Sequence, residues 1–312
     1  MRRAIQAGIG MSFAAALFAS SPALAQPAQC LGTGQAKYVV DSTLLGLINP
    51  LGFEEQLTAK ACYPLIDEPG ILFDYSQWEA GAFTYVGPIY THLGGFVAIA
   101  PLSILVLRAE ASGVGFWTVP MAGAGYVPLS QYQKFVPDSQ APIEKLRPTT
   151  GVNVAFTATL QGAAPLGSRL QIMASDTFGA DWWTMGESSH YLNFRRDVVL
   201  AREDWVLKNT LQVALDIRGN DEVFIRVGAI DDLTYVPGVP GSHWNFLLNQ
   251  LTGYFSVFVR RDLVKHDTWL RDIEPYLRIG GYTHGDPNRT QNVMVLTGIS
   301  LAWALPIEGA AR

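Results

Sequence analysis

The stretch Asn292–Leu305, NVMVLTGISLAWAL, alternates along its length between bulky apolar residues and residues that are small or polar. The bulky face carries Val293, Val295, Thr297, Ile299, Leu301 and Trp303, and Leu296 is the one bulky residue on the other face. A period of two over about a dozen residues predicts a β-strand longer than the usual five or six residues. It approaches the roughly nine to eleven residues with which a tilted strand crosses a bilayer. We therefore predict a long strand with one apolar face.

The same alternation recurs through the chain, most clearly where residues 207–217 and 223–229 flank the turn residues Arg218–Asp221. Further alternating segments are residues 152–161, 170–175, 251–261 and 273–284. Less regular candidates are residues 38–48, 53–65, 71–86, 93–99 and 102–111, with a weak one at 188–200. We predict an all-β protein of about 12 strands, within a range of 10–14 and even in number, because bacterial single-chain barrels have even strand numbers.

A soluble sandwich also alternates, so the face opposite the apolar one decides between the two architectures. That face combines small residues such as Gly228, Gly298 and Ala302 with isolated charges, as expected for side chains crowded into a narrow lumen. Aromatic residues near predicted strand ends are candidates for interfacial girdles. They are Trp78, Tyr90, Trp117, Trp205, Tyr235, Trp244, Trp269, Tyr282 and Trp303. The pattern favours a transmembrane antiparallel β-barrel.

Composition excludes other classes of protein. Of the 312 residues, 49% are hydrophobic and only 16% are charged, which is low compared with about 25% in soluble domains. The net charge of −5 makes nucleic-acid binding unexpected. The segment after the first 25 residues has no uncharged apolar run of the roughly 18 residues that a spanning helix needs.

The first residues have the organisation of a secretory signal. Arg2 and Arg3 precede an apolar run, and Ala23-Leu24-Ala25 suits cleavage before Gln26. We predict a signal peptide over residues 1–25, an N-terminal segment over 26–36, a barrel over 37–305 and a C-terminal tail over 306–312. Export favours a disulfide between the two cysteines, Cys30 and Cys62. This bond would pin the N-terminal segment across the periplasmic mouth as a short plug.

The chain resembles bacterial outer-membrane β-barrel proteins as a class, from about Tyr38 to Leu305. The resemblance is based on the signal peptide, the long alternating hairpin Leu207–Ala229 and the terminal strand Asn292–Leu305. It implies localisation in the bacterial outer membrane, with membrane lipid and the barrel-assembly machinery as partners. The chain differs from the commonest pattern in its C-terminus, because Pro306–Arg312 follow where such chains usually end at an aromatic residue.

The charges predicted for the lumen are the main candidates for functional residues. They are Lys60, Arg108, Arg169, Lys208, Asp216, Glu222, Arg226, Arg260, Glu274 and Arg278. Buried charges must pair or be hydrated. Ion pairing between neighbouring strands is one interpretation, and a charged constriction in a small aqueous pore is the other. The segment Gly113–Thr150, rich in Gly, Pro and Gln, is an external loop or a loop folded into the pore.

Candidates for chemistry are weak. Ser188-Ser189-His190 with Asn193, and Ser242-His243, contain nucleophile and base types, but neighbours in a strand point to opposite faces. Asp231-Asp232 suits a solvated turn better than a calcium site, and the five histidines have no ligand spacing. We assign no catalytic residue, no metal and no cofactor. The function expected is a channel or transport component for small polar solutes; a structural or assembly role and a barrel-embedded lipid hydrolase remain alternatives.

Overall fold

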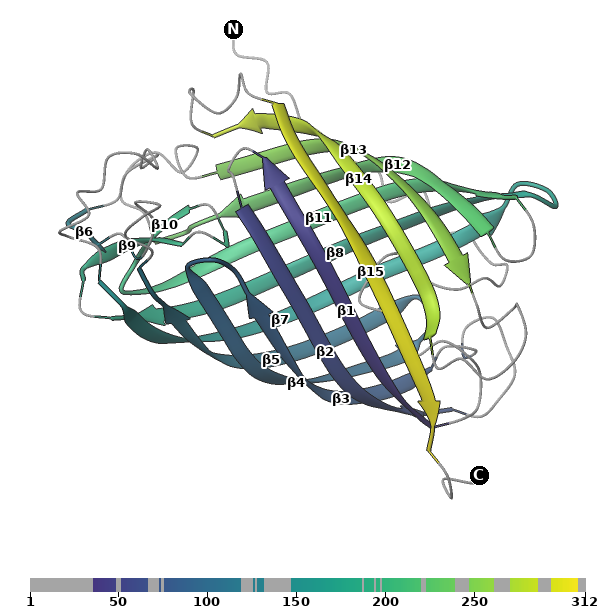
Figure 1. The fold of residues 1–312 in the computed structure, drawn as a ribbon, viewed down its shortest axis with the longest axis horizontal. Helices are drawn as coiled ribbons and strands as arrows, with labels where there is room; N and C mark the ends of the chain where they lie inside the picture. The colour runs from purple at the N-terminus through teal and green to yellow at the C-terminus, as the bar shows by residue number, and fades with distance from the viewer. Residues whose placement is uncertain are drawn as a thin grey trace, which may run out of the picture.

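The computed structural model describes residues 36–48, 52–66, 73, 76–118, 126, 128–131, 147–186, 188–193, 195–196, 198–219, 223–238, 247–260, 270–285 and 293–307. Its twelve long strands form one closed antiparallel barrel (Figure 1). The first six are β1 (Lys37–Ile48), β2 (Gly52–Pro64), β3 (Gln77–Val86), β4 (Tyr90–Leu102), β5 (Leu105–Phe116) and β7 (Thr149–Pro165). The second six are β8 (Leu170–Met185), β11 (Glu203–Arg218), β12 (Val223–Tyr235), β13 (Leu247–Arg260), β14 (Leu270–His284) and β15 (Val293–Pro306). The predicted fold class and strand number are confirmed.

Closure is made by β1 and β15, which pair from Lys37 opposite Pro306 to Ile48 opposite Val295. The order around the ring is β1-β15-β14-β13-β12-β11-β8-β7-β5-β4-β3-β2, so every strand pairs with two neighbours and no edge remains open. A barrel with all its backbone groups paired is one of the two structures that can span hydrocarbon.

The strand predictions need two corrections. Residues 71–86, expected to supply two strands, contribute one, β3. Residues 188–200, which we counted as a wall strand, form β9 (His190–Asn193) and β10 (Val198–Ala201) outside the ring. These pair with each other and with β6 (Pro128–Leu129) as a separate three-stranded sheet. Apolar alternation describes any strand with one buried face, so it did not separate this sheet from the wall.

The two ends of the barrel differ. One end, called here the turn end, holds Lys37, Pro306 and the connections that follow β2, β4, β7, β11 and β13. The other, called the loop end, holds the connections that follow β1, β3, β5, β8, β12 and β14, together with the small sheet (Figure 1). Outer-membrane barrels have short periplasmic turns and longer extracellular loops. We therefore assign the loop end to the extracellular side.

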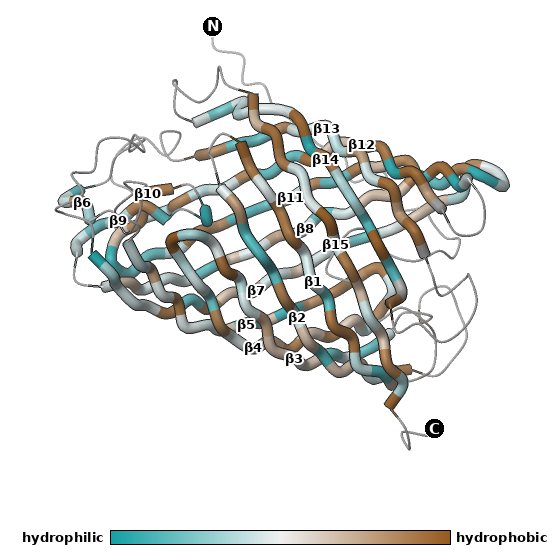
Figure 2. Tube along the Cα trace, viewed as in Figure 1, coloured by the Kyte–Doolittle hydropathy of each residue, from teal (hydrophilic) through white to brown (hydrophobic). Residues whose placement is uncertain are grey.

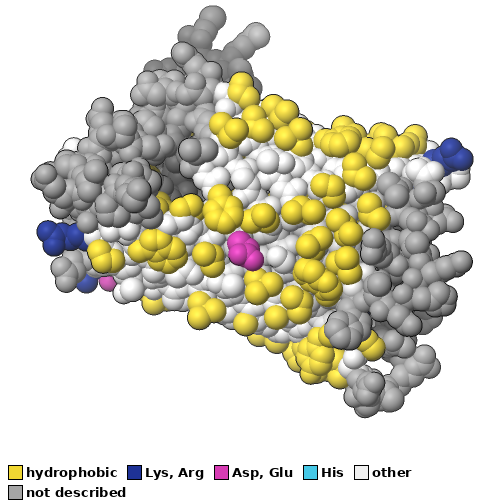
Figure 3. Space-filling model, in the orientation of Figure 1, with side chains coloured by type: hydrophobic (Ala, Val, Ile, Leu, Met, Phe, Trp, Pro, Cys, Tyr) yellow, Lys and Arg dark blue, Asp and Glu magenta, His cyan; other side chains and the backbone are white. Residues whose placement is uncertain are grey.

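Side chains alternate between an apolar outer face and a polar inner face. Large apolar residues are exposed along the wall, among them Leu93, Phe156 and Phe178, each more than half exposed. Figure 3 shows hydrophobic side chains across the outside, with Lys and Arg near the ends, and Figure 2 shows the alternation along the strands. Asp216, Arg226 and other charged residues are instead buried. A sandwich would bury the apolar face, so the fold is that of bacterial outer-membrane β-barrels, the class that the sequence resembles.

The aromatic girdle is only partly as expected. On the outside near the turn end, Trp78 is 41% exposed and stacks on Tyr63, with ring centroids 4.7 Å apart. Trp205 is exposed near the loop end. Tyr90 and Tyr282 were assigned wrongly, because both rings are buried inside the barrel. Trp244 and Trp269 lie outside the described residues.

Some predicted features lie partly or wholly outside the described residues. These are the signal peptide, residues 26–35, Cys30, Ser242, His243 and most of the segment Gly113–Thr150. Within the part of the chain that the structure describes, no helix is long and apolar enough to cross a membrane. The barrel itself runs from Lys37 to Pro306.

Candidate functional site: the barrel lumen

The turn between β9 and β10 carries two arginines into the lumen. Arg195 Nε lies 3.3 Å from Glu54 Oε2 on β2, and its guanidinium lies 3.8 Å from the centre of the Tyr85 ring on β3. Arg196 forms an ion pair with Asp181 on β8. Burial opposes the charge of Arg195, but Glu54 raises the pKa of its guanidinium above the usual value. The turn is therefore fixed by charge-assisted contacts.

These contacts reach walls on nearly opposite sides of the ring. Between β2 and β8 lie four strands in one direction and six in the other. Consecutive residues Arg195 and Arg196 bind these two walls, so the β9–β10 turn crosses the lumen. Sequence reasoning missed both arginines and Asp181, because the sequence pattern predicts residues 188–200 to be a strand of the barrel wall. The pair Arg195-Arg196 next to an apolar segment was the only indication in the sequence.

An apolar core fills the loop end behind this turn. Tyr191 on β9 and Leu200 on β10 are fully buried, together with Trp183 and Met185 on β8. Further members come from β4, β5, β11, β13 and β14: Tyr90, Val114, Phe116, Val206, Leu248 and Tyr282. Burial raises the pKa of the Tyr191 phenol, so the ring remains neutral. The described residues thus pack the β9–β10 hairpin against the wall at the loop end through an apolar core.

Lys208 joins the same charge cluster from β11. Its Nζ lies 3.0 Å from Asp181 Oδ1, so Asp181 serves both Lys208 and Arg196. Gly179 on β8 is the partner of Lys208 in the ladder, and a Cβ there would lie 2.4 Å from Lys208 Cε. Glycine is therefore needed at 179 to let the lysine stem lie flat against the wall.

Along the rest of the lumen, cations pair with acids on the same strand, on a neighbouring strand or, for Arg278 of β14 and Asp232 of β12, across one intervening strand. Four such pairs are described: Lys60–Glu79 at 3.1 Å, Arg108–Glu110 at 3.0 Å, Arg226–Asp216 at 2.7 Å and Arg278–Asp232 at 2.5 Å. Tyr254 also donates a hydrogen bond of 2.5 Å to Glu274. Of the two interpretations of the lumen charges, ion pairing between wall residues describes these contacts.

Most of the predicted lumen residues lie on the inner face. They are Lys60, Arg108, Lys208, Asp216, Arg226, Glu274 and Arg278. Arg169 does not, because β7 continues to Pro165 and the exposed Arg169 lies in the turn after Gly167, whose φ is +112°. Glu222 and the side chain of Arg260 lie outside the described part. Sequence reasoning missed Asp41 on β1, which is buried on the inner face.

Among the described residues, neither Ser189-His190 nor Asp231-Asp232 forms a site, and Ser242-His243 lies outside them. Ser189 Oγ donates its only proton to the carbonyl oxygen of Leu129 at 3.1 Å, so it is not activated by His190, whose Nδ1 lies 3.2 Å away. Ser189 touches His190 because it lies in a bend before β9. Asp231 and Asp232 were expected in a turn, but they lie in β12 and point to opposite faces. No metal-binding group of three His, Cys, Asp or Glu residues occurs among the described residues.

Cys62 lies on the inner face with Thr58 and Lys60, as its register predicts, and is 1% exposed. It carries no free thiol. Its expected partner Cys30 is outside the described residues, so the Cys30–Cys62 bond and the periplasmic plug stay predictions.

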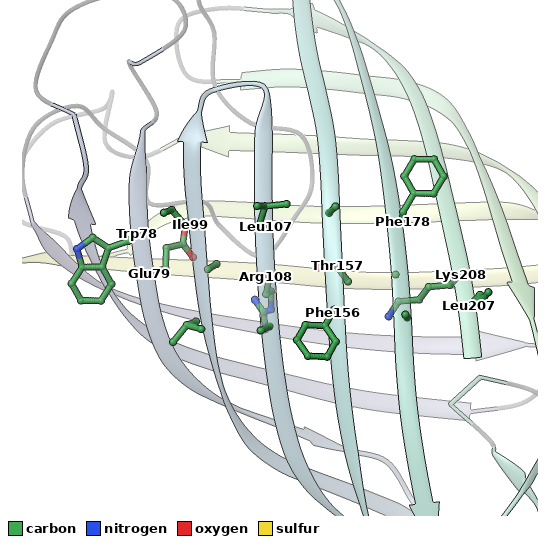
Figure 4. A pocket seen from close by; sticks show the side chains of 16 residues that line it. Trp78, Glu79, Ile99, Leu107, Arg108, Phe156, Thr157, Phe178, Leu207 and Lys208 are labelled. Atoms are coloured by element: carbon green, nitrogen blue, oxygen red, sulfur yellow. The ribbon is translucent and has the colours of Figure 1, made fainter. Parts of the chain in front are cut away.

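A separate hollow of about 810 Å³ lies on the outside of β3, β4, β5, β7, β8 and β11. Figure 4 shows its side chains coming from adjacent strands. Its exposed rim is apolar and includes Trp78, Ile99, Leu107, Phe156, Phe178 and Leu207. Glu79, Arg108 and Lys208 of the inner face also belong to its lining, but its exposed side chains are apolar, so we do not assign the polar chemistry to it.

No protein-family model matches this sequence, and no curated protein sequence is similar to it. Similar folds occur among solved structures. The NanC porin is 10% identical over 85% of this chain and 100% of that one, with a TM-score of 0.40. The translocator domain of the autotransporter NalP from Neisseria meningitidis is 8% identical over 88% and 90%, with a TM-score of 0.44. An outer-membrane channel from Pseudomonas putida F1 is 9% identical over 91% and 100%, with a TM-score of 0.41.

Proposed function

We propose that this outer-membrane barrel is a channel for small polar solutes and that the β9–β10 hairpin closes its loop end. The observation that carries the proposal is the inner face, where charged and hydrogen-bonding side chains replace an apolar core through the middle and turn-end parts of the lumen. A barrel that served only as a membrane anchor would be more stable with an apolar interior, since buried ion pairs add little net stability.

The closing element is one connection between neighbouring wall strands. The hairpin follows β8 and precedes β11, and the ladder between these two strands is complete from Glu203 opposite Thr184 to Ile217 opposite Leu170. Movement of the hairpin would therefore leave the wall intact. Passage of a solute requires the contacts of Arg195 and Arg196 to break and the apolar core to part.

The test is conductance of the refolded full-length protein in planar bilayers. We expect small or rare openings, and a several-fold larger conductance when residues 188–201 are replaced by a short Gly-Ser linker. A matched control replaces Gly219, in the turn after β11, by a linker of the same length, which adds chain at the turn end without touching the hairpin. Silence of all three proteins in correctly folded, heat-modifiable form would refute the channel.

The packed loop end favours a second candidate, a barrel with a structural or assembly role. Its apolar core contains fully buried residues such as Trp183, Tyr191 and Leu200, which supports a barrel that does not conduct. A silent hairpin-deleted barrel that is nevertheless required for envelope integrity in cells would support this candidate over the channel.

A further inference from the structure

Asp41, on the inner face of β1 near the turn end, lacks the partners that the other lumen acids have. The residue is 4% exposed, and neither carboxylate oxygen has a hydrogen-bond partner within the described part of the chain. An isolated buried carboxylate is costly, and such groups are normally paired. A cationic ligand in the lumen would supply the charge that this carboxylate lacks.

The charges that act on Asp41 are Lys60, Glu79 and Asp272, which are one cation and two further acids. Lys60 is already engaged, since its Nζ lies 3.1 Å from Glu79 Oε2. Asp272, 5% exposed, occupies the same row of the ladder as Asp41, with Ala302 between them. Arg260 on β13 is the ladder partner of Asp272. Because Lys60 is a single cation and is already paired with Glu79, it does not neutralise both Glu79 and Asp41.

The wall around Asp41 offers further oxygen atoms and a small side chain. Ala302, between the two carboxylates, has the shortest side chain that a chiral residue can have. In the next row Thr43 Oγ1 donates to Ser300 Oγ at 3.0 Å, and Thr58 faces Asp41 from β2. Hydroxyl oxygens can accept hydrogen bonds, so this patch adds acceptors to the carboxylates.

We propose that this patch, centred on Asp41 and Asp272 with Thr43, Thr58 and Ser300, binds the ammonium or guanidinium group of an organic cation. The proposal rests on the proposed channel and names the class of solute that it takes. A metal ion is a poorer fit, because the described residues contain no group of three acidic, His or Cys side chains close enough to hold one. Ammonium and guanidinium groups carry several donors over a larger span, which suits separated acceptors.

The first test is calorimetric titration of agmatine, which has one guanidinium and one ammonium group, into the full-length barrel in detergent. We expect saturable binding, at least about tenfold weaker in Asp41→Asn, a loss equivalent to about 1.4 kcal/mol. Asp41→Glu should retain most of the affinity. The control Asp176→Asn removes a carboxylate from the outer face, where it accepts a hydrogen bond from Asn209, and should bind agmatine like the wild type. Urea, a neutral molecule of similar shape to guanidinium, should not bind.

A second variant covers the case in which Asp41→Asn fails to fold. Ala302→Leu keeps every charge and places a larger side chain between the two carboxylates, so it should weaken agmatine binding as well. Absence of wild-type binding, or equal affinity in the wild type and the folded Asp41 and Ala302 variants, would overturn the site.

Bilayer recordings distinguish failure of the cation site from failure of the proposed channel. With a conducting barrel, agmatine at the turn end should block wild-type current and block Asp41→Asn less. Conductance with no agmatine effect would leave the channel and remove the cation site. Agmatine binding that depends on Asp41 in a barrel that never conducts would keep the site and remove the channel.

Discussion

The loop-end and turn-end halves of the lumen each contain a buried aspartate, but the two aspartates differ in whether they have a partner. At the loop end Asp181, fully buried, binds both Arg196 and Lys208. At the turn end Asp41, almost as deeply buried, has no hydrogen-bond partner among the described residues. The loop end also contains the apolar core around Trp183, whose ring contacts His92 from β4 with centroids 5.4 Å apart. On the two proposals above, the loop end is the closed part of the lumen and the turn end is the part that receives a ligand.

Removing one carboxylate from each half should give the largest contrast. Asp181→Asn leaves two cations without their acid, and loss of one partner of a buried ion pair costs about 3–5 kcal/mol. Asp41→Asn removes a charge that has no partner, so we expect its free energy of unfolding to be unchanged or higher. Urea unfolding in micelles, followed by tryptophan fluorescence, measures both. Similar losses in the two variants would show that the halves do not differ in this way.

Arginine substitutions test the two faces of the wall toward the turn end. Leu215 faces out of β11 and Gln212 faces in. An arginine facing lipid costs about 2–4 kcal/mol at the bilayer midplane, whereas one in the lumen can reach water or an acid. Leu215→Arg should therefore reduce the yield of heat-modifiable barrel more than Gln212→Arg.

A second pair on β15 repeats the test, with Ile299→Arg outward and Ser300→Arg inward. Equal yields within both pairs would mean that the faces are assigned wrongly.

Gly179 provides a smaller perturbation of the loop-end charge cluster. A valine there collides with the Lys208 stem, and overpacking of this kind costs about 1–3 kcal/mol. We expect Gly179→Val to lower the urea midpoint and to raise the frequency of channel opening. Gly253→Val is the control, since its Cβ meets only the Ile279 carbonyl oxygen at 3.6 Å. The same opening frequency in both variants would show that Lys208 does not help to hold the hairpin.

Reduction of the expected Cys30–Cys62 bond should have the smallest effect on stability. The barrel is held by twelve ladders of backbone hydrogen bonds, while the bond would restrain only the segment before β1. We expect an unchanged urea midpoint and an altered single-channel trace after reduction. Mass spectrometry of non-reduced peptides tests the bond itself, and two free thiols in protein from an oxidising envelope would exclude it.

Residues 207–229 and 293–304 show what the local sequence pattern predicts correctly, which is the face of the strand on which each side chain lies. Where their side chains are described, the outward and inward faces agree with the prediction, because a strand places alternate side chains on opposite sides whatever its partners are. The inner positions of Lys60, Asp216 and Arg226 follow from the same period. Residues 188–200 show where local pattern fails, since an apolar alternation is equally suited to a wall strand and to an inner hairpin.

The amino-acid pattern alone was enough to establish a membrane barrel of twelve or so strands, the face of each regular strand and most of the charges of the lumen. Period-two alternation and strand length are local properties, and a bilayer outside with water inside imposes them on every strand. The ring order, the hairpin that crosses between β2 and β8, and the contrast between Asp181 and Asp41 depended on the tertiary structure. Whether a buried charge has a partner depends on residues brought from distant parts of the chain, such as Arg196 beside Asp181, and no spacing along the sequence encodes that meeting.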